Sequence, residues 1–503
     1  MSADMFLYFA GFLLLYIFTG HFLHKLQNLP PNPYPSLPII GHLYLLKTPL
    51  HRALARLSYS HGPLLFFRFG SRPVLVVSSP SLAEECLTKN DMVFANRPRF
   101  TVGKHLGYNY TTMAWASYSD HWRNLRRISS IEVLSANRLQ MLSSIRAEEI
   151  KSTIRRLANQ QNEAVEMRTV FFELTLNIMM RMIAGKRYFG ENGADLKEVK
   201  KFQQIVAETT RLSGLPYISD YLPFMRWAER RKEKEMTELH KRRDEFMQSL
   251  IEAQRKGLRS GSYSLSEEKK NMIEVLLSLQ EREPEYYTDE IIRGLMIVLL
   301  VGATEPSVST MEWAVALLLD HPEILKKAQK EIDDQIGHNR LIDESDIARL
   351  PYLNNVVQET LRMYSPLPLG VPHESSEDCT VGGFRVPRGT MLIVNLWGIE
   401  NDPTLWNDPE KFMPERFQGV EGARDGFRFM PFGSGRRRCP GNGLSMKMIA
   451  LELGSLIQCF EWDKVCEEKE DMRERTTATI SKAKRLQAKC RPRPASENLL
   501  SKI

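Results

Sequence analysis

A single cysteine, inside a stretch rich in glycine and arginine, is the residue best placed to carry out chemistry. Residues 432–441 have the order Phe-Gly-Ser-Gly-Arg-Arg-Arg-Cys-Pro-Gly, and an apolar run of helical spacing, Leu444 to Ile457, follows directly. The backbone N–H groups and the dipole at a helix N-terminus stabilise a thiolate. We therefore expect Cys439 to be a sulfur of low pKa at the start of that helix.

The residues around Cys439 indicate what such a sulfur would bind. Gly435 and Gly441 would allow the backbone to come close to a flat ligand, and Arg437 would pair with a carboxylate. This combination suits a thiolate that is the axial ligand of haem iron, where the sulfur donates electron density in favour of O–O cleavage. The alternative is a buried structural cysteine at a turn, which a bare Cys-Pro-Gly would favour.

The complete ten-residue pattern favours the haem ligand. Phe432, Gly435, Arg437, Cys439 and Gly441 occupy the fixed positions of Phe-x-x-Gly-x-Arg-x-Cys-x-Gly. The stretch therefore resembles the haem-binding signature of the cytochrome P450 monooxygenases. The resemblance implies that Cys439 is the iron ligand of a haem b cofactor and that the other four residues belong to the cofactor-binding site.

Residues elsewhere in the chain resemble the propionate-binding residues of the same family. Trp122 and Arg126 match a Trp-x-x-x-Arg motif whose side chains hold a haem propionate. Arg437 and His373, the latter in Pro372-His373-Glu374, are implied to contact propionates as well. Without the cysteine signature, Trp122 and Arg126 would indicate only an ordinary amphipathic helix.

A carboxylate and two arginines resemble the structural lock of the family. Glu359 and Arg362 are three residues apart on a predicted helix that ends before Pro366, so they share one helix face. In isolation such a pair is usually a weak surface ion pair. Because Pro414-Glu415-Arg416-Phe417 follows downstream, the pair resembles the Glu-Arg-Arg lock, with Arg416 as its third member.

The long apolar segment Ile291–Leu319 departs from the family pattern at one position. The resemblance places it over the distal face of the haem, where the family has an acidic residue followed by threonine. This chain has Gly302-Ala303-Thr304-Glu305-Pro306-Ser307 there. Glu305 occupies the acidic position and is a candidate for relaying protons, whereas Pro306 replaces the threonine that takes part in O2 activation.

The proline has two possible consequences. It has no hydroxyl and no N–H, and inside a helix it frees the carbonyl of Gly302. One interpretation is a kink that only shapes the pocket. The other is altered oxygen chemistry, with a water in the groove or Thr304 as possible replacements for the missing hydroxyl. We count Thr304, Glu305 and Pro306 as the candidate catalytic residues.

The elements that must position these residues are predicted to be mainly helical. Helical apolar spacing occurs in Ser81–Lys89, His121–Ser130, Glu166–Ala184, Asp195–Leu212, Met225–Arg255, Thr288–Leu319 and Pro322–Ile336. Strand candidates are few, namely Leu64–Phe69, Val74–Ser78, Thr380–Val386 and Met391–Asn395. The expected fold is mainly α with a small β lobe. The resemblance implies the haem-thiolate fold behind an N-terminal transmembrane helix.

The N-terminal segment differs in composition from the rest. No charged residue occurs from Met5 to His24, and about 20 apolar residues span a hydrocarbon core of about 30 Å. Asp4 precedes the run and Lys25 follows it, which favours an uncleaved anchor with a cytosolic body over a cleaved signal peptide. Leu29–Pro38 then has five prolines in ten residues and is predicted to be a stiff spacer.

These features predict three regions. Residues 1–25 form the membrane anchor, residues 26–43 a proline-rich hinge, and residues 44–503 one haem-thiolate catalytic domain. The 503 residues are 43% hydrophobic and 26% charged, which excludes disordered and collagen-like chains. The net charge of +7 is spread over the chain, so we expect no nucleic-acid partner. Six cysteines without a CxxC pair indicate reduced thiols.

The resemblance implies a single-pass enzyme of the endoplasmic reticulum membrane that activates O2 with electrons from NADPH–cytochrome P450 reductase. It is strongest to the plant microsomal isoflavone-hydroxylase-like group, through residues 29–43 and 372–378. We expect a small plant phenolic or aromatic substrate, and hydroxylation, oxidative ring-forming phenol coupling, or both. The alternatives are a purely hydroxylating enzyme on a flavonoid-, lignan- or terpenoid-type substrate, a non-catalytic haem-binding protein, and a membrane-tethered scaffold without haem.

Overall fold

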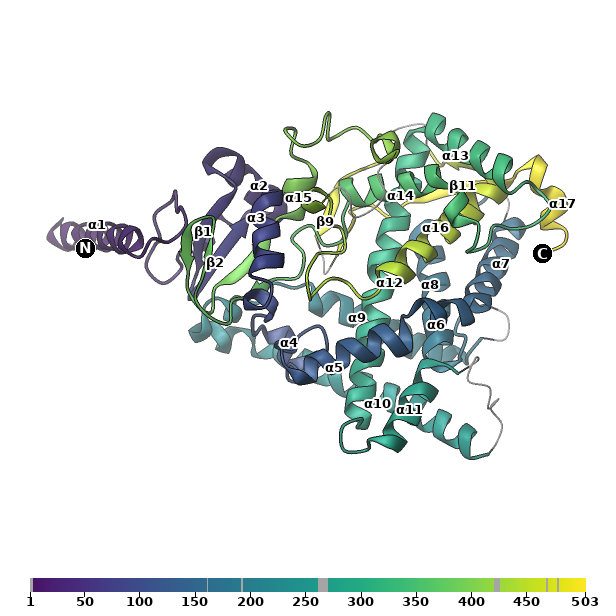
Figure 1. The fold of residues 1–503 in the computed structure, drawn as a ribbon, viewed down its shortest axis with the longest axis horizontal. Helices are drawn as coiled ribbons and strands as arrows, with labels where there is room; N and C mark the ends of the chain where they lie inside the picture. Colours follow the sequence, from purple (N-terminus) through teal and green to yellow (C-terminus); the bar gives the residue numbers. More distant parts are fainter. Residues whose placement is uncertain are drawn as a thin grey trace.

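The structure is a computed structural model that describes residues 3–160, 162–190, 193–260, 270–419, 426–466, 469–476 and 479–503. Helices dominate it (Figure 1). They are α1 Ala3–Leu26, α2 Leu50–His61, α3 Pro80–Glu84, α4 Thr101–His105, α5 Asp120–Ile128, α6 Ala136–Met141, α7 Ser143–Asn159, α8 Met167–Ala184, α9 Leu196–Ser213, α10 Arg230–Arg259, α11 Met272–Arg282, α12 Asp289–Asp320, α13 Pro322–Gln335, α14 Pro351–Met363, α15 Leu396–Glu400, α16 Asn442–Cys459 and α17 Glu497–Leu500.

Two small sheets lie at opposite ends of the helical body, and β9 lies between them (Figure 1). The strands are β1 Leu64–Phe69, β2 Arg72–Val77, β3 Ala164–Glu166, β4 His373–Glu374, β5 Cys379–Val381, β6 Phe384–Val386, β7 Met391–Val394, β8 Phe460–Lys464, β9 Glu474–Thr476, β10 Ile480–Lys482 and β11 Gln487–Pro492. One sheet has the order β1-β2-β7-β4, in which only β2 and β7 are parallel. A second has the order β3-β11-β8 and lies near the C-terminus. The prediction of a mainly α fold with a small β lobe is confirmed.

Two strand predictions were wrong or incomplete. The segment Thr380–Val386, predicted as one strand, is the antiparallel hairpin of β5 and β6. Gly382 and Gly383 have φ of +56° and +82° and reverse the chain between them. The strands β8 to β11 were not predicted. β8 and β11 pair with each other across a long stretch of sequence, and β9 and β10 are three-residue strands that pair as sequence neighbours.

Helix α12 runs through the centre of the body and packs against α8, α10, α14 and α16. Thr288 caps its N-terminus by accepting a hydrogen bond from the N–H of Ile291. Nearly every residue from Ser307 to Leu319 is buried, as expected for a helix that is apolar on all sides. The helix continues without interruption past Pro306, because neighbouring turns retain their own hydrogen bonds.

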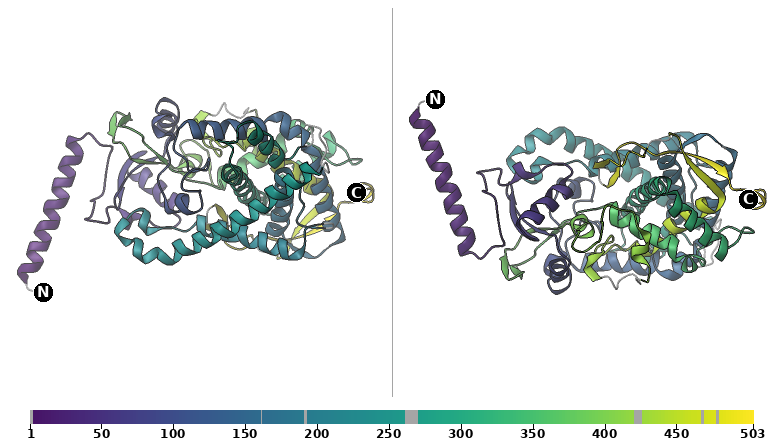
Figure 2. Two further views of the ribbon diagram at one scale, coloured as in Figure 1. Left: turned by 90° about the horizontal axis from the view of Figure 1, so that it is seen from below. Right: turned by 90° about the horizontal axis from the view of Figure 1, so that it is seen from above.

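Helix α1 stands apart from the body, and the two termini lie at opposite ends of the molecule (Figures 1 and 2). Among the described residues, α1 and α12 are long and apolar enough to cross a membrane. More than half of the apolar window of α12 is buried in the protein, whereas none of the α1 window is buried. The N-terminal helix therefore has the character of a membrane anchor, and α12 that of a core helix.

The proline-rich hinge is docked on the body rather than free. The N–H of Phe66 on β1 donates to the carbonyl of Pro31 (2.9 Å). The N–H of Arg385 on β6 donates to the carbonyl of Asn28 (2.8 Å). The stiffness predicted for this spacer stays a prediction, and the structure adds that the extended chain exposes backbone groups that the edges of nearby strands satisfy. The docking fixes where α1 leaves the body.

Candidate functional site

The loop that carries Cys439 is a tight turn directly before α16. The N–H of Cys439 donates to the carbonyl of Phe432 (2.9 Å), and the N–H of Arg438 donates to that of Gly435 (3.1 Å). A Cβ added to Gly441 would lie 3.8 Å from the Cys439 sulfur. Cys439 is accessible to solvent although most of its surroundings are protein atoms, so the sulfur borders an opening in the protein.

The predicted low pKa of Cys439 is not found in the protein alone. Burial raises the pKa of the thiol, although the N–H groups of Gly441 and Asn442 and the charges of Arg126 and Arg438 act in the opposite direction. The free-energy cost of removing a thiolate from water exceeds the stabilisation that one helix N-terminus and two arginines provide. A coordinated metal cation would reverse this balance, because it deprotonates its thiol ligand.

The reason for glycine at position 435 also differs from the prediction. Gly435 has φ +68°, a left-handed conformation that favours glycine. An added Cβ would lie 2.5 Å from the Asp91 carboxylate and 2.6 Å from the Leu87 carbonyl. The N–H of Arg436 donates to both oxygens of Asp91 (3.1 Å each). Gly435 thus permits the loop to pack on the segment around Asp91, a contact that was not predicted, while its approach to a flat ligand stays a prediction.

Trp122 and Arg126 lie on α5, which Ser119 caps by accepting from the N–H of Trp122. The Arg126 side chain donates to the carbonyl of Arg438 (2.6 Å). The Trp122 indole N–H donates to the carbonyl of Met113 (3.0 Å), and the guanidinium of Arg437 lies 4.3 Å from its ring centroid. The structure therefore brings α5 and the cysteine loop into direct contact, as the motifs predicted.

A buried arginine that the sequence analysis missed lies beside these residues. Arg97 donates to the carbonyls of Val371 and Pro372 (2.7 and 2.8 Å), while its Nε has no hydrogen-bond partner among the described residues. Burial, with the charge of Arg437, lowers the pKa of Arg97 to about 9. The only sequence signal was its place between Asn96 and Pro98, which does not distinguish it from other arginines.

His373 belongs to the same cluster. It lies on β4, and its Nδ1 donates to the carbonyl of Phe94 (2.8 Å). Burial and the charges of Arg97 and Arg437 hold the pKa of His373 well below its usual range. Burial and the charge of Arg126 lower the pKa of Arg437 to about 10.

This donor set fits a haem. Buried cationic groups that repel one another require an anion nearby, because a buried charge is costly unless it is paired. Arg97, Arg126, Arg437 and His373 would pair with the two propionates of haem, and the accessible Cys439 sulfur would coordinate its iron. No group of three or more His, Cys, Asp and Glu side chains suited to a metal occurs in the described part of the chain. The residues therefore fit an iron that takes a single ligand from the protein.

Helix α12 borders the same opening. Gly302 is exposed in the middle of this central helix, and an added Cβ would have no atom within 4 Å. The hydroxyl of Ser307 lies 3.4 Å from that of Ser445 in the first turn of α16. Since Ser445 follows closely after Cys439, we infer that Gly302 and Cys439 face a common space.

The three candidate catalytic residues differ in what they present to this space. The Thr304 side chain is fully buried and its hydroxyl donates to the carbonyl of Leu300 (2.7 Å). Glu305 is held by Arg168 on α8 (2.6 Å), which also pairs with Glu312 (3.1 Å). Arg168 was not predicted. Pro306 supplies no donor, so the freed carbonyl of Gly302 is the polar group left here.

The predicted lock is assembled in the interior. Arg362 donates to both carboxylate oxygens of Glu359 (2.7 and 2.9 Å) and to the carbonyls of Glu400 and Pro409. Arg416 donates to Glu359 as well (3.1 Å). Glu359 and Arg362 are both 0% exposed. The alternative of a surface ion pair is therefore wrong for this chain.

The family model of cytochrome P450 matches residues 30–490. The chain belongs to the cytochrome P450 family. The haem-iron cofactor and the monooxygenase class expected from the sequence are thereby confirmed, while the role of each site residue stays a prediction.

Plant proteins are similar to this P450 over nearly the whole chain. An isoflavone 3'-hydroxylase of Medicago truncatula is 46% identical over 94% of this chain and 95% of its own length. A (+)-piperitol/(+)-sesamin synthase of Sesamum radiatum is 45% identical over 95% of this chain and 94% of its own. An isoflavone 2'-hydroxylase of Glycyrrhiza echinata is 44% identical over 93% of both chains. The predicted resemblance to the isoflavone-hydroxylase-like group is confirmed.

Solved structures agree with the fold. A zebrafish cytochrome P450 with progesterone has a TM-score of 0.76 and 25% identity, and covers 89% of this chain and 100% of its own. A second structure, with abiraterone, has a TM-score of 0.74 and 26% identity, and covers 88% and 99%. The haem-thiolate fold behind an apolar N-terminal helix is thus shown.

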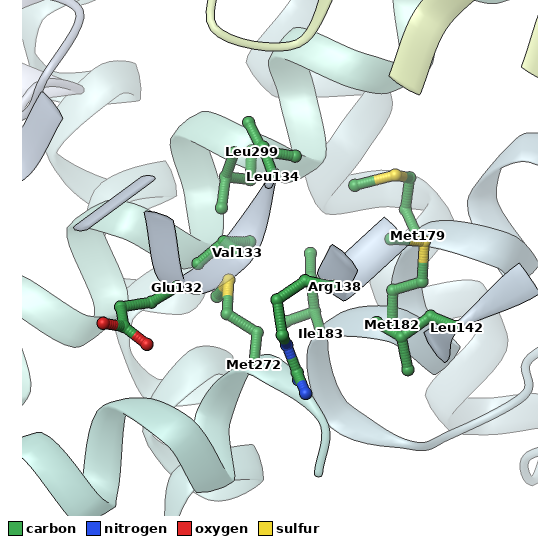
Figure 3. A pocket seen from close by; sticks show the side chains of 10 residues that line it. All are labelled: Glu132, Val133, Leu134, Arg138, Leu142, Met179, Met182, Ile183, Met272 and Leu299. Atoms are coloured by element: carbon green, nitrogen blue, oxygen red, sulfur yellow. The ribbon is translucent and has the colours of Figure 1, made fainter. Parts of the chain in front are cut away.

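A separate apolar crevice is not a substrate site. It lies between α6, α8, α11 and α12 and is lined by side chains such as Met179, Met182 and Leu299 (Figure 3). Its volume is about 10 Å³, which is room for about one water molecule.

Proposed function

We propose that this P450 oxidises a small plant phenolic in the endoplasmic reticulum membrane and closes a ring within it by forming a C–O or C–C bond, alongside hydroxylation. The observation that carries the proposal is Pro306, which stands one turn after the exposed Gly302 in an uninterrupted α12. Bound haem supplies the activation of O2 and the removal of electrons from the substrate. The protein must then control the supply of protons.

The chain is poorly equipped for proton delivery at this point. Pro306 has no hydroxyl, the Thr304 hydroxyl is engaged with Leu300, and the Glu305 carboxylate is engaged with Arg168. Oxygen insertion depends on a proton reaching the distal oxygen, and a broken relay favours release of peroxide instead. Abstraction of hydrogen from a phenolic O–H makes a weaker demand on that relay, because the substrate itself carries the proton.

The two reactions differ in where the oxygen atoms go. In ring closure the substrate loses two hydrogen atoms, and O2 takes them up with two electrons from the reductase and two protons from solvent. Both oxygen atoms leave as water, so none enters the product. In hydroxylation one oxygen atom enters the product and the other leaves as water. The names of the relatives, two hydroxylases and one synthase, support both reaction types.

Hydroxylation alone is the second candidate. The freed carbonyl of Gly302 would accept a hydrogen bond from a water, and such a water would replace the missing threonine hydroxyl. The full burial of Thr304 favours this water over Thr304 as the replacement. A flavonoid-, lignan- or terpenoid-type substrate would fit this alternative.

Restoring the threonine tests the proposal. We expect Pro306→Thr to shift products of a phenolic panel toward hydroxylation and to reduce peroxide release, because the new hydroxyl completes the relay. The shift in product ratio should be of the order of a hundredfold, the lower end of the range for one proton-transfer group. The measurement uses labelled O2 with mass analysis, in which the ring-closed product of the native enzyme lacks any label from the coupling step.

A matched control separates chemistry from helix shape. Pro306→Val adds a side chain of similar size to threonine and restores the N–H without a hydroxyl. If Pro306→Val shifts the products as far as Pro306→Thr, the proline acts only as a structural kink. If every product gains oxygen from O2, the hydroxylating alternative replaces the proposal.

We propose NADPH–cytochrome P450 reductase as the electron donor. Arg436 and Arg438 lie on the cysteine loop, and Arg126 joins that loop to α5, which also carries the exposed Arg123 and Arg127. Exposed cations on this face would steer an acidic partner toward the cysteine side of the haem. Intramolecular partners, such as Asp120 beside Arg123, reduce but do not remove this field.

We propose that the face around α1 rests on the endoplasmic reticulum membrane, with the body in the cytosol. Ile39, Phe224 and Trp227 are 69%, 60% and 65% exposed. The turn between β1 and β2 joins their segments, since Gly70 donates to the Ile40 carbonyl (3.1 Å) and Ser71 to that of Tyr221 (2.8 Å). Exposed apolar side chains grouped in this way support contact with a lipid interface.

This arrangement predicts two points of membrane attachment. Removing residues 1–24 should leave the spectrum of the carbon-monoxide complex intact and only loosen attachment. Phe224→Asn in that truncated protein should lower vesicle binding by about tenfold, because one large apolar side chain contributes about 1.5–3 kcal/mol.

Ile131→Asn, at an apolar residue of similar exposure remote from α1, is the matched control. Equal loss of vesicle binding in Ile131→Asn would contradict the proposed face. The sequon at Asn109 should stay unglycosylated in the full-length protein, and a glycan there would overturn the cytosolic topology.

A further inference from the structure

A run of three left-handed residues occurs in the segment of residues 101–116. Tyr108, Asn109 and Tyr110 have φ of +50°, +49° and +65°. Asparagine tolerates this conformation, but tyrosine rarely adopts it because its Cβ crowds the following carbonyl. Such backbone persists only where the surroundings hold it, and it is concentrated at ligand-binding sites and switch regions.

Contacts within the 101–116 segment hold part of this turn. The N–H of Asn109 donates to the Lys104 carbonyl (3.0 Å), and that of Tyr110 donates to the Gly103 carbonyl (3.1 Å). An added Cβ at Gly103 would lie 2.9 Å from the Tyr110 ring and 3.0 Å from the Trp115 ring. The turn therefore packs on its own short helix α4, and only glycine fits beneath it.

A carboxylate on α10 holds the turn from outside. The Tyr108 hydroxyl donates to Oδ1 of Asp244 (2.7 Å), and Nε of Arg293 on α12 donates to the same oxygen (2.6 Å). Burial and the hydrogen bond to Asp244 raise the pKa of Tyr108, so its hydroxyl remains a donor. The neighbouring Arg243 is buried and donates to the Leu106 carbonyl (2.5 Å). Asp244 thus connects the turn, α10 and α12.

The two ends of the segment have different contacts, and only the second belongs to the candidate site. The N–H and the hydroxyl of Thr101 both donate to Oδ1 of Asp220 (2.7 Å each). At the other end, the carbonyls of Met113 and Ala116 accept from Arg437 (3.3 and 2.5 Å).

The middle of the segment lies against α12. A Cβ added to Gly294 of α12 would lie 3.4 Å from the Thr112 methyl group. The segment therefore extends from α12 to the arginine cluster that would hold the haem propionates, and there it would border a bound substrate.

We propose that Asp244 is a positioning residue for the substrate. Through Tyr108 it holds the left-handed turn, and the turn holds the 101–116 segment as a preformed wall of the substrate pocket. Arg293 orients the Asp244 carboxylate. The inference rests on the proposed function and deepens it, because it names what sets the orientation of the phenolic ring at the haem.

Hydrogen exchange of the full-length holoenzyme directly tests whether Asp244 stabilises the turn at residues 108–110. In Asp244→Asn the amides of Asn109, Tyr110 and their neighbours should exchange about tenfold faster or more, since local opening becomes easier while the rest of the protein is unchanged. Tyr108→Phe, which removes one hydroxyl and no packing volume, should give the same pattern more weakly. The control is Glu245→Gln, at the adjacent exposed carboxylate of α10.

A second measurement separates positioning from stability. Imidazole needs only the space at the iron, whereas 1-phenylimidazole also extends toward the pocket wall. Loss of a preformed wall should weaken 1-phenylimidazole binding about threefold to tenfold in Asp244→Asn and leave imidazole binding unchanged. The carbon-monoxide spectrum should stay that of the native protein, which distinguishes failure here from failure of the haem assignment.

The outcomes are decisive in both directions. Faster exchange confined to residues 101–116, with a selective loss of 1-phenylimidazole affinity, supports the proposal. Exchange in Asp244→Asn and Tyr108→Phe no faster than in Glu245→Gln overturns it. Faster exchange throughout the chain, or equal weakening of both ligands, also overturns it, because Asp244 would then serve general stability.

Discussion

Replacing Cys439 with alanine is expected to abolish the strongly red-shifted band of the reduced carbon-monoxide complex, together with all turnover. Only a thiolate-ligated haem gives that band, and alanine has no ligand atom. The turn itself should survive, because the Cys439 to Phe432 hydrogen bond joins backbone atoms. The loss would therefore report the iron ligand and not a collapsed loop.

Cys466→Ala is the matched control, because Cys466 is also exposed and lacks the glycines and arginines of the signature. It should keep the full band and full turnover. Difference spectra and haem content of the purified proteins measure both variants. Retention of the band in Cys439→Ala would refute the ligand assignment.

Glu359→Gln should have the largest effect on stability. Glutamine keeps the shape of the side chain but removes the charge that compensates Arg362 and Arg416, and Arg362 is completely buried. Breaking a buried ion pair by neutralising one partner costs about 3–5 kcal/mol. Since the whole stability of a folded protein is about 5–15 kcal/mol, we expect little correctly folded, haem-loaded protein.

The comparison variant is Glu415→Gln, in which the carboxylate of a half-exposed pair with Lys327 is neutralised. Its cost should stay within about 0.5 kcal/mol, because solvent screens an exposed pair. Denaturant unfolding and the yield of the carbon-monoxide complex measure both variants. A Glu359→Gln protein as stable as Glu415→Gln would show that the lock does not stabilise the fold.

Local sequence was sufficient for the parts of the site that depend on neighbours in the chain. The cysteine loop was predictable because ten consecutive residues specify its ligand, its turn and the helix that follows. Trp122 and Arg126 were predictable because one turn of helix places both on the same face. Helix α12 was predictable from its continuous apolar composition, and Pro306 from its identity alone, since its missing N–H and hydroxyl do not depend on context.

Other features were decided only by the tertiary structure, because they arise where distant segments meet. Arg97 belongs to the cation cluster because it is buried and lies close to Arg437. The residues next to it in sequence indicate neither its burial nor this neighbour. Glu305 is engaged by Arg168 from α8, which lies far away in sequence. The docked hinge depends on strands that pair much later in the chain.

The same distinction applies to the chemistry of Cys439 and to the turn at residues 108–110. Helix position alone predicted a low thiol pKa, whereas burial within the assembled body raises it. The sequence by itself determined the family and the cofactor and predicted Cys439 as the iron ligand, since short-range patterns of side chains encode them. The tertiary structure decided the electrostatics of the site and the contacts of that turn, because desolvation and long-range contacts exist only once the chain has folded.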